Sequence, residues 1–113
     1  MGHVGSSTTI SMVETQMSKV EYAVVDIDAA ADTVVTAQEC DFLGAWVTEA
    51  LSAHDCDIEN GNGGDVVGRF AASAAIGTAI DGHGIRMSSG INIAANAAAD
   101  GLVVVAFRTT SQV

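Results

Sequence analysis

A short alternating segment that runs into a glycine-rich turn limits the fold of this chain more than any other feature. Over residues 54–59, neutral side chains alternate with acidic ones, which is the pattern of a strand with one face on a core and one in water. Residues 60–64, Asn-Gly-Asn-Gly-Gly, follow at once, and Asn and Gly supply the positive φ angles of tight turns. Residues 65–70 return as a second strand, so the segment predicts an antiparallel hairpin with an acidic outer face.

Other strand-like runs, rich in Val, Ile and aromatic residues, recur along the chain with turn residues between them. They span residues 20–27, 33–37, 42–47, 85–87, 91–93 and 102–108. Residues 71–80 are rich in alanine, and we expect a loop or a single helical turn there. Short strands at regular intervals predict an all-β fold, an antiparallel β-sandwich or jelly-roll-like barrel.

Two of these runs also predict which side chains share a face. In residues 20–27 the apolar positions change from even-numbered to odd-numbered residues, which predicts a β-bulge or a strand buried on both faces. In residues 42–47, simple alternation places Phe42 and Trp46 on one face and Ala45 on the other. Trp46 is the only tryptophan. We interpret it first as a core anchor, with an interface anchor as the functional alternative.

The chain of 113 residues is long enough for one domain with a modest core. Residues 1–12 are rich in Gly, Ser and Thr, so we expect an extended N-terminal arm, followed by one β-sandwich domain over residues 13–113. Residues 7–11 have good strand propensity, and Ile10 is a predicted interface residue within a strand that adds to the edge of a neighbouring molecule. A disordered tail fits the arm equally well.

The apolar composition favours self-association. Apolar residues make up 49% of the chain, but aromatic residues only 4%, so Ala, Val and Ile carry most of the core. Small side chains bury little surface each. A core of this kind favours a homo-oligomer that shares apolar surface between copies, and we expect a trimer.

The chain is strongly acidic. Fourteen Asp and Glu residues stand against four Lys and Arg residues, a net charge of −10 with a single lysine, Lys19. This composition is typical of proteins from hypersaline cytoplasm, where salt screens the repulsion between like charges. An ordinary acidic protein from a mesophile is the alternative interpretation. No basic patch is present to neutralise phosphates, so nucleic acid is not an expected partner.

No membrane segment is expected. Residues 1–12 have neither a cationic start nor an apolar stretch, so they do not resemble a signal peptide. The longest strongly apolar run, residues 102–107, is far too short to span a bilayer. Cys40 and Cys56 lack metal-ligand spacing, and we expect two small buried hydrophobes; a disulfide would require that their strands be neighbours.

The polar side chains around the hairpin offer weak metal candidates. His54 and Cys56 are predicted to point away from the neighbouring carboxylates, and only His83 is left to add, so no zinc site is expected. Asp57, Glu59 and Asp65 are weak calcium candidates, because carboxylate oxygens around a turn suit that ion. A solvated hairpin without metal is the favoured interpretation.

Catalytic arrangements are also weak. Ser52, His54 and Asp55 include the residue types of a hydrolase triad, but triad partners converge from separate segments and no nucleophile elbow is present. Residues 81–84, Asp-Gly-His-Gly, predict a polar turn with His83 exposed. We therefore expect no enzyme activity, no catalytic residue and no cofactor.

Five motifs follow one another over the last two thirds of the chain. They are an aromatic-Gly strand leading to Thr-Glu-Ala-Leu-Ser-Ala-His (42–54), an acidic strand leading to a Gly turn (57–64), Ala-Ser-Ala-Ala-Ile-Gly-Thr (72–78), a Gly-led apolar strand (89–93) and Asn-Ala-Ala-Ala-Asp-Gly leading to Val-Val-Val-Ala-Phe-Arg (96–108). Their order resembles a family of small β-sandwich structural proteins from tailed phages. In that family a proline usually precedes the Ala-Ser-Ala-Ala motif. This chain has Ala71 at that position, a departure that leaves the shape of the loop open.

The resemblance implies a structural virion protein, one that decorates or cements the capsid, or forms a turret, and stabilises the particle. Its implied partners are the major capsid protein or other virion proteins, and its implied location is the virion, assembled in the host cytoplasm. The acidic composition points to a tailed virus of haloarchaea. The alternative is a loop-based calcium- or carbohydrate-binding module in a tail or fibre that attaches to the host.

Overall fold

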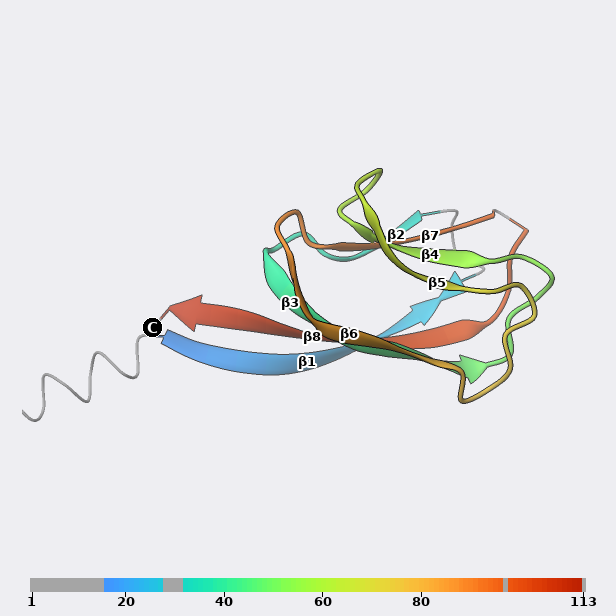
Figure 1. The fold of residues 1–113 in the computed structure, drawn as a ribbon, viewed down its shortest axis with the longest axis horizontal. Helices are drawn as coiled ribbons and strands as arrows, with labels where there is room; N and C mark the ends of the chain where they lie inside the picture. Colours follow the sequence, from blue (N-terminus) through green and yellow to red (C-terminus); the bar gives the residue numbers. More distant parts are fainter. Residues whose placement is uncertain (1–15, 28–31, 97, 113) are drawn as a thin grey trace, which may run out of the picture.

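The computed structural model describes residues 16–27, 32–96 and 98–112. These residues form two antiparallel sheets that lie face to face (Figure 1), with the strand order β1-β8-β3-β6 in sheet A and β2-β7-β4-β5 in sheet B. The expected all-β antiparallel sandwich is confirmed. The predicted arm, residues 1–12 with Ile10, lies outside the described residues. The strands are β1 (Gln16–Asp26), β2 (Asp32–Thr36), β3 (Cys40–Glu49), β4 (Cys56–Asn60), β5 (Val66–Phe70), β6 (Ala79–Met87), β7 (Ile91–Ala95) and β8 (Leu102–Gln112).

The predicted hairpin is present as β4 and β5. The backbone N–H of Asn60 donates to the carbonyl oxygen of Asp65 at 2.8 Å, and the N–H of Gly64 donates to that of Gly61 at 3.0 Å. Gly61 has a φ of 76°, which an L side chain rarely adopts. On β4, Ile58 is buried while Glu59 is half-buried, so the acidic outer face is also confirmed.

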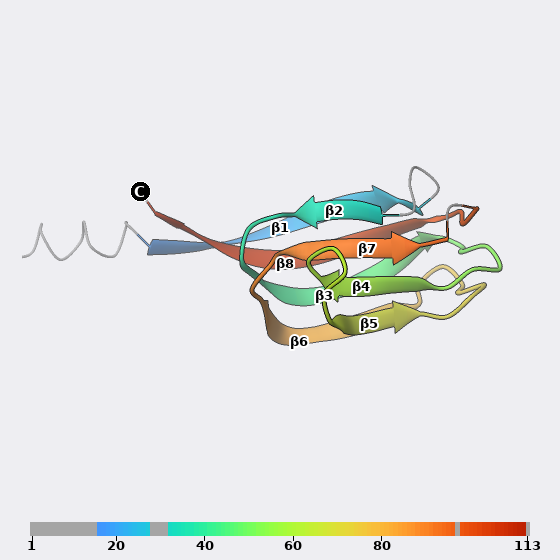
Figure 2. The same ribbon diagram turned by 90° about the horizontal axis from the view of Figure 1, so that it is seen from above.

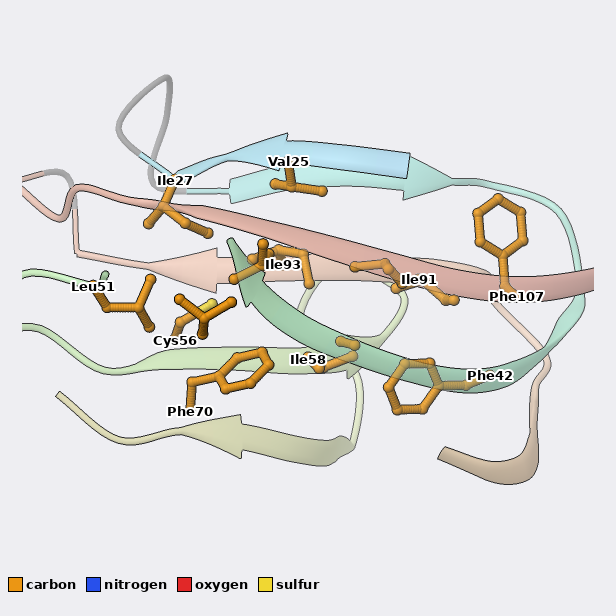
Figure 3. Close-up of a cluster of buried hydrophobic side chains, with 14 of the residues drawn as sticks. Val25, Ile27, Phe42, Leu51, Cys56, Ile58, Phe70, Ile91, Ile93 and Phe107 are labelled. Carbon is orange, nitrogen blue, oxygen red and sulfur yellow. The ribbon is translucent and has the colours of Figure 1, made fainter. Parts of the chain in front are cut away.

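The core lies between the two sheets (Figure 3) and is filled from both. Phe42 of β3, Ile58 of β4 and Phe70 of β5 are among its largest fully buried side chains. Cys40 and Cys56 are both buried and free, and they belong to strands of different sheets. The prediction of two small buried hydrophobes is therefore confirmed. Burial raises the pKa of the Cys40 thiol to about 11 and that of the Cys56 thiol to about 12.

A bulge in β3 overturns the simple alternation expected for that strand. Phe42 and Gly44 lie opposite the consecutive residues Phe107 and Ala106 of β8, so Leu43 is an extra residue relative to β8. One inserted residue reverses the phase of a strand. Phe42 therefore faces the core together with Ala45, and it does not share a face with Trp46.

Residues 81–84 are not the turn that we expected, because three residues of β6, 82–84, lie opposite the single residue Leu43 of β3. They lie inside β6, which pairs with β3 on both sides of the register shift. His83 has a φ of 55° and Gly84 a φ of 70°, so the polar segment is taken up as an irregularity within the strand. The His83 side chain is exposed, as predicted. Residues 71–78 form turns and connecting chain rather than a helical turn.

Two strands of sheet A extend beyond the others. β1 and β8 pair along the whole of Gln16–Asp26 and Leu102–Gln112, whereas β3 pairs only with residues 102–108 of β8. Residues 16–19 and 109–112 therefore form a two-stranded projecting ribbon, which extends past the sandwich in both views (Figures 1 and 2).

Candidate functional site

The outer face of sheet A carries apolar side chains that the core does not use. β1 is an edge strand, and its pairing with β8 shows no register shift, so the bulge expected in residues 20–27 is absent. Val25 and Ile27 point into the core. The even-numbered apolar residues therefore point outward, and the expectation of burial on both faces was wrong because nothing in the described chain covers this side.

The exposed side chains of β1 form a continuous row, which we call the apolar stripe: Val20, Tyr22 and Val24. Their exposed fractions are 43%, 67% and 69%. A single exposed apolar side chain is ordinary, but a contiguous group is typical of an interaction surface. Elsewhere in the described chain the large exposed apolar side chains are scattered: Val34, Val66, Ile76 and Ile85. The apolar stripe is therefore the strongest candidate for a functional surface.

Aromatic packing holds part of the stripe in place. The rings of Tyr22 and Trp46 meet edge to face, with centroids 6.2 Å apart. Ala106 of β8 lies opposite Tyr22, and Gly44 of β3 lies opposite Ala106. Both of these small residues are buried. Such aromatic pairs contribute about 0.5–1.5 kcal/mol beyond the surface that they bury.

Trp46 is therefore not the core anchor that we expected. It is half-buried, and the phase of β3 after its bulge turns it to the outer face, opposite Val104 of β8. Its contact with Tyr22 joins it to the apolar stripe. The alternative prediction, an interface residue, stays a prediction.

Charged residues border the stripe at one end. Val20 lies opposite Arg108, which lies opposite Asp41 of β3. The Asp41 carboxylate pairs with Arg86 of β6 at 3.3 Å, and Arg86 also approaches Glu39 at 3.5 Å. The outer face of sheet A therefore combines an apolar row with a rim of mixed charge, the usual composition of a protein contact surface.

Two of the three weak calcium candidates, Asp57 and Glu59, are engaged by other protein groups. Both carboxylate oxygens of Asp57 accept hydrogen bonds from the Arg69 guanidinium. The Oε1 atom of Glu59 accepts hydrogen bonds from the Gly63 N–H at 3.1 Å and from the Asn92 side-chain amide at 3.0 Å. Asp65 is exposed in the turn. Among the residues that the structure describes, no group of three or more His, Cys, Asp or Glu side chains could hold a metal ion.

Asn92 is the one fully buried amide near these carboxylates. Its Nδ2 atom also donates to Asp32 at 3.3 Å, while its Oδ1 atom has no hydrogen-bond partner within the described chain. The amide therefore bridges two acidic side chains on sheet B as a donor. Its position on β7, between two buried isoleucines, gave no sign of this role in the sequence.

Two of the three residues with triad-like chemistry, Ser52 and Asp55, have separate partners. The Ser52 hydroxyl accepts a hydrogen bond from the Asp100 N–H at 3.0 Å, which ties two loops together. Asp55 lies 3.8 Å from Arg69, and His83 lies 3.7 Å from Asp81. No contact found in the described residues joins Ser52, His54 and Asp55 as a catalytic unit.

No protein-family model and no curated protein matches the chain. Within the described residues, no helix is long and apolar enough to cross a membrane.

Proposed function

We propose that this chain is a structural virion protein that binds the capsid lattice, without catalytic activity, and that the outer face of sheet A is its contact surface. The observation that carries the proposal is the apolar stripe, a contiguous exposed row on an otherwise very acidic protein. The virion context rests on the sequence motifs of residues 42–108. Capsid decoration or cementing is the role that such a small domain fits best.

The physical basis of attachment would be burial of the stripe against a neighbour. Aromatic residues are enriched among the side chains that dominate protein contacts, and Tyr22 with its neighbour Trp46 supplies both a large apolar area and polar edges. The acidic side chains elsewhere would remain in solvent and keep the particle surface soluble. Molar salt would screen their mutual repulsion.

The alternative, a calcium- or carbohydrate-binding module in host attachment, has less support. Its candidate ligands Asp57 and Glu59 already accept hydrogen bonds from Arg69, Gly63 and Asn92. No observation on the hairpin favours a bound cation over these internal partners.

The first prediction concerns attachment of the chain to particles. Val24→Ser should reduce its occupancy on virions by about fivefold, because burial of the two methyl groups of Val24 against a neighbour contributes about 1 kcal/mol or more. The matched control is Ile76→Ser: the two side chains are 69% and 68% exposed, but Ile76 lies in the loop before β6, away from the stripe. Quantitative mass spectrometry of purified particles, produced with each variant, measures the occupancy.

Two results would contradict the proposal. The first is absence of the wild-type chain from purified particles, which would remove the virion role. The second is equal loss of occupancy for both variants, which would show that the stripe has no special part in attachment.

A further inference from the structure

At Val20, Tyr22 and Val24, the edge of β1 presents backbone hydrogen-bonding groups that no strand in the described part of the chain pairs with. The N–H of Ile27 donates to the carbonyl oxygen of Gly101 at 2.9 Å, and the register runs unbroken from there along the strand. Hydrogen-bonded and non-hydrogen-bonded positions alternate in an antiparallel pair. Odd-numbered residues of β1 therefore bond to β8, and Val20, Tyr22 and Val24 direct their N–H and C=O groups to the open side.

The other three sheet edges are protected in the ways that natural β-proteins use against edge pairing. β2 and β5 have five residues each, and their pairings with β7 and β4 contain register shifts. β6 is interrupted by its irregularity at residues 82–84. By contrast, β1 is eleven residues long, has no register shift, and contains no proline because the whole chain has none.

The charge of this edge suits a second copy of the same acidic chain. Strand β1 (Gln16–Asp26) carries Lys19, Glu21 and Asp26, and strand β8 (Leu102–Gln112) carries only Arg108, so the sum is +1 −1 −1 +1 = 0. The chain as a whole has a net charge of −10. Two copies that approach through this edge therefore avoid the repulsion between their acidic faces.

Among the described strands, none pairs with the projecting ribbon as a third strand. Residues 16–19 pair only with residues 109–112, and an isolated two-stranded ribbon is marginally stable at best in water. A strand added along β1 would give this ribbon a third strand and satisfy its outer backbone groups.

We propose that two copies of this chain pair through the open edges of β1, antiparallel about a twofold axis at Tyr22. Tyr22 then lies opposite the partner's Tyr22, and Val20 lies opposite the partner's Val24. All of these positions direct backbone groups to the open side, and they match aromatic and β-branched side chains across the strands. The two copies of sheet A become one continuous sheet, with both apolar stripes side by side on one face.

Neighbouring registers fit less well. If the partner strand slides by two residues in one direction, Glu21 lies opposite the partner's Glu21, and like charges directly opposite are destabilising. If it slides by two residues in the other direction, Val20 lies opposite the partner's Asp26. The Tyr22-centred register avoids both pairs and keeps all six apolar side chains together.

This inference deepens the proposed function, since it names the first partner of an assembly protein as its own copy. It also fits the homo-oligomer expected from the thin core, with two copies in place of three. Pairing is measured on the purified full chain and attachment on particles, so failure of either proposal is visible without the other.

The main experiment removes one outward backbone donor. Val24→Pro takes away an N–H that points to the open edge and leaves the β1–β8 hydrogen bonds intact, which is why edge strands tolerate proline. Val24→Thr is the matched control, because it keeps the N–H and the β-branched shape. Sedimentation equilibrium in molar KCl should show a wild-type dimer at about 100 μM, a retained dimer for Val24→Thr and dimerisation weakened by about 100-fold for Val24→Pro.

Circular dichroism with thermal unfolding shows whether Val24→Pro is folded. A wild-type monomer or trimer would overturn the proposal, and so would a folded Val24→Pro that pairs as well as the wild type. Should Val24→Pro fail to fold, cross-linking through one introduced cysteine at a time decides whether the two copies pair through β1.

The cross-linking experiment tests the register directly. Opposed hydrogen-bonded residues have Cα atoms about 5.5 Å apart, within the range for a disulfide. Oxidised Tyr22→Cys should therefore give a covalent dimer, while Val20→Cys should not, since it faces the partner's Val24. Equal cross-linking of both variants, or none of either, would overturn the twofold register.

The N-terminal arm is the competing occupant of this edge. A variant without residues 2–12 should remain dimeric and should still cross-link through Tyr22→Cys. Loss of the dimer on this deletion would show that the arm, and not β1 of the second copy, pairs with the edge.

Discussion

At the scale of single residues, the two thiols of the core should lower the stability of the fold at alkaline pH. Cys40 and Cys56 have pKa values raised by burial from 9.0 to about 11 and about 12. Below pH 9.0 the thiols are protonated in both the folded and the unfolded chain, so their contribution is constant. Above pH 9.0 the unfolded thiols ionise first, the unfolded chain binds fewer protons, and the free energy of unfolding falls.

The prediction is a loss of stability that begins near pH 9.0 and continues through the folded pKa values of about 11 and about 12. The slope should approach about 1.4 kcal/mol per pH unit for each thiol. Urea unfolding at a series of pH values measures it, and Cys56→Ala should show a shallower decline. The same slope in the variant would contradict the assignment to the thiols.

At the scale of elements, the turn between β6 and β7 depends on one glycine. Gly90 has a φ of +87°, and a Cβ there would lie within 2.1 Å of the Thr36 carbonyl oxygen, which is impossible without movement of the backbone. Gly77 has a similar φ of +90° but nothing within 4 Å of such a Cβ. The two positions therefore separate backbone strain from steric overlap.

The prediction is that Gly77→Ala costs about 1–2 kcal/mol, the strain of a left-handed alanine. Gly90→Ala should cost at least about 1–3 kcal/mol more, since it also forces the chain after β2 away. Urea unfolding of both variants gives the difference. Equal losses would show that the contact with Thr36 relaxes without cost.

The elements also show how far the sequence predicts this molecule. The hairpin of β4 and β5 follows from local rules, because the alternation and the glycine turn are contained in residues 54–70. The bulge at Leu43 is defined by the pairing of β3 with β8, a strand distant in the sequence, and nothing in residues 42–47 alone indicates an inserted residue. Local patterns therefore predicted the fold class and the acidic hairpin but not the face of Trp46.

The candidate site escaped prediction for a related reason. The two apolar phases of residues 20–27 were visible in the sequence, but whether the second phase is covered depends on the place of β1 in its sheet. Strand order is a property of the whole fold, and it leaves β1 at an edge. The useful signal was Lys19 and Glu21 on the odd-numbered phase: an edge strand can hold them where a central strand could not.

At the scale of the whole molecule, charge balance decides the conditions under which the chain is stable. Arg69 and Arg86 are held in ion pairs with Asp57 and Asp41, and the acidic residues greatly outnumber all four basic ones. Exposed ion pairs of this kind contribute little. General repulsion among the carboxylates is therefore the larger electrostatic effect.

The prediction is that the thermal midpoint rises between about 0.1 M and about 1 M KCl, as the Debye length falls from about 10 Å to about 3 Å. A double variant, Glu49→Gln with Asp65→Asn, has a net charge of −10 + 2 = −8, and its midpoint should rise less. Calorimetry of both proteins over the salt series is the measurement. A midpoint that does not respond to salt would remove the halophilic interpretation.

The projecting ribbon has one more consequence, for the connectivity of the chain. Gln16 and Gln112 lie opposite each other at its tip, about 5 Å apart as in any antiparallel pair. A linker of a few residues could join Gln16 to Gln112, as in a circular permutation. The exposed turn at Gly63, where nothing lies within 4 Å of an added Cβ, could then be opened to give new ends. A cargo fused there would be displayed from the β4–β5 hairpin of sheet B, on the side of the sandwich that β5 and β6 occupy, while the copies pair through β1 on the other side.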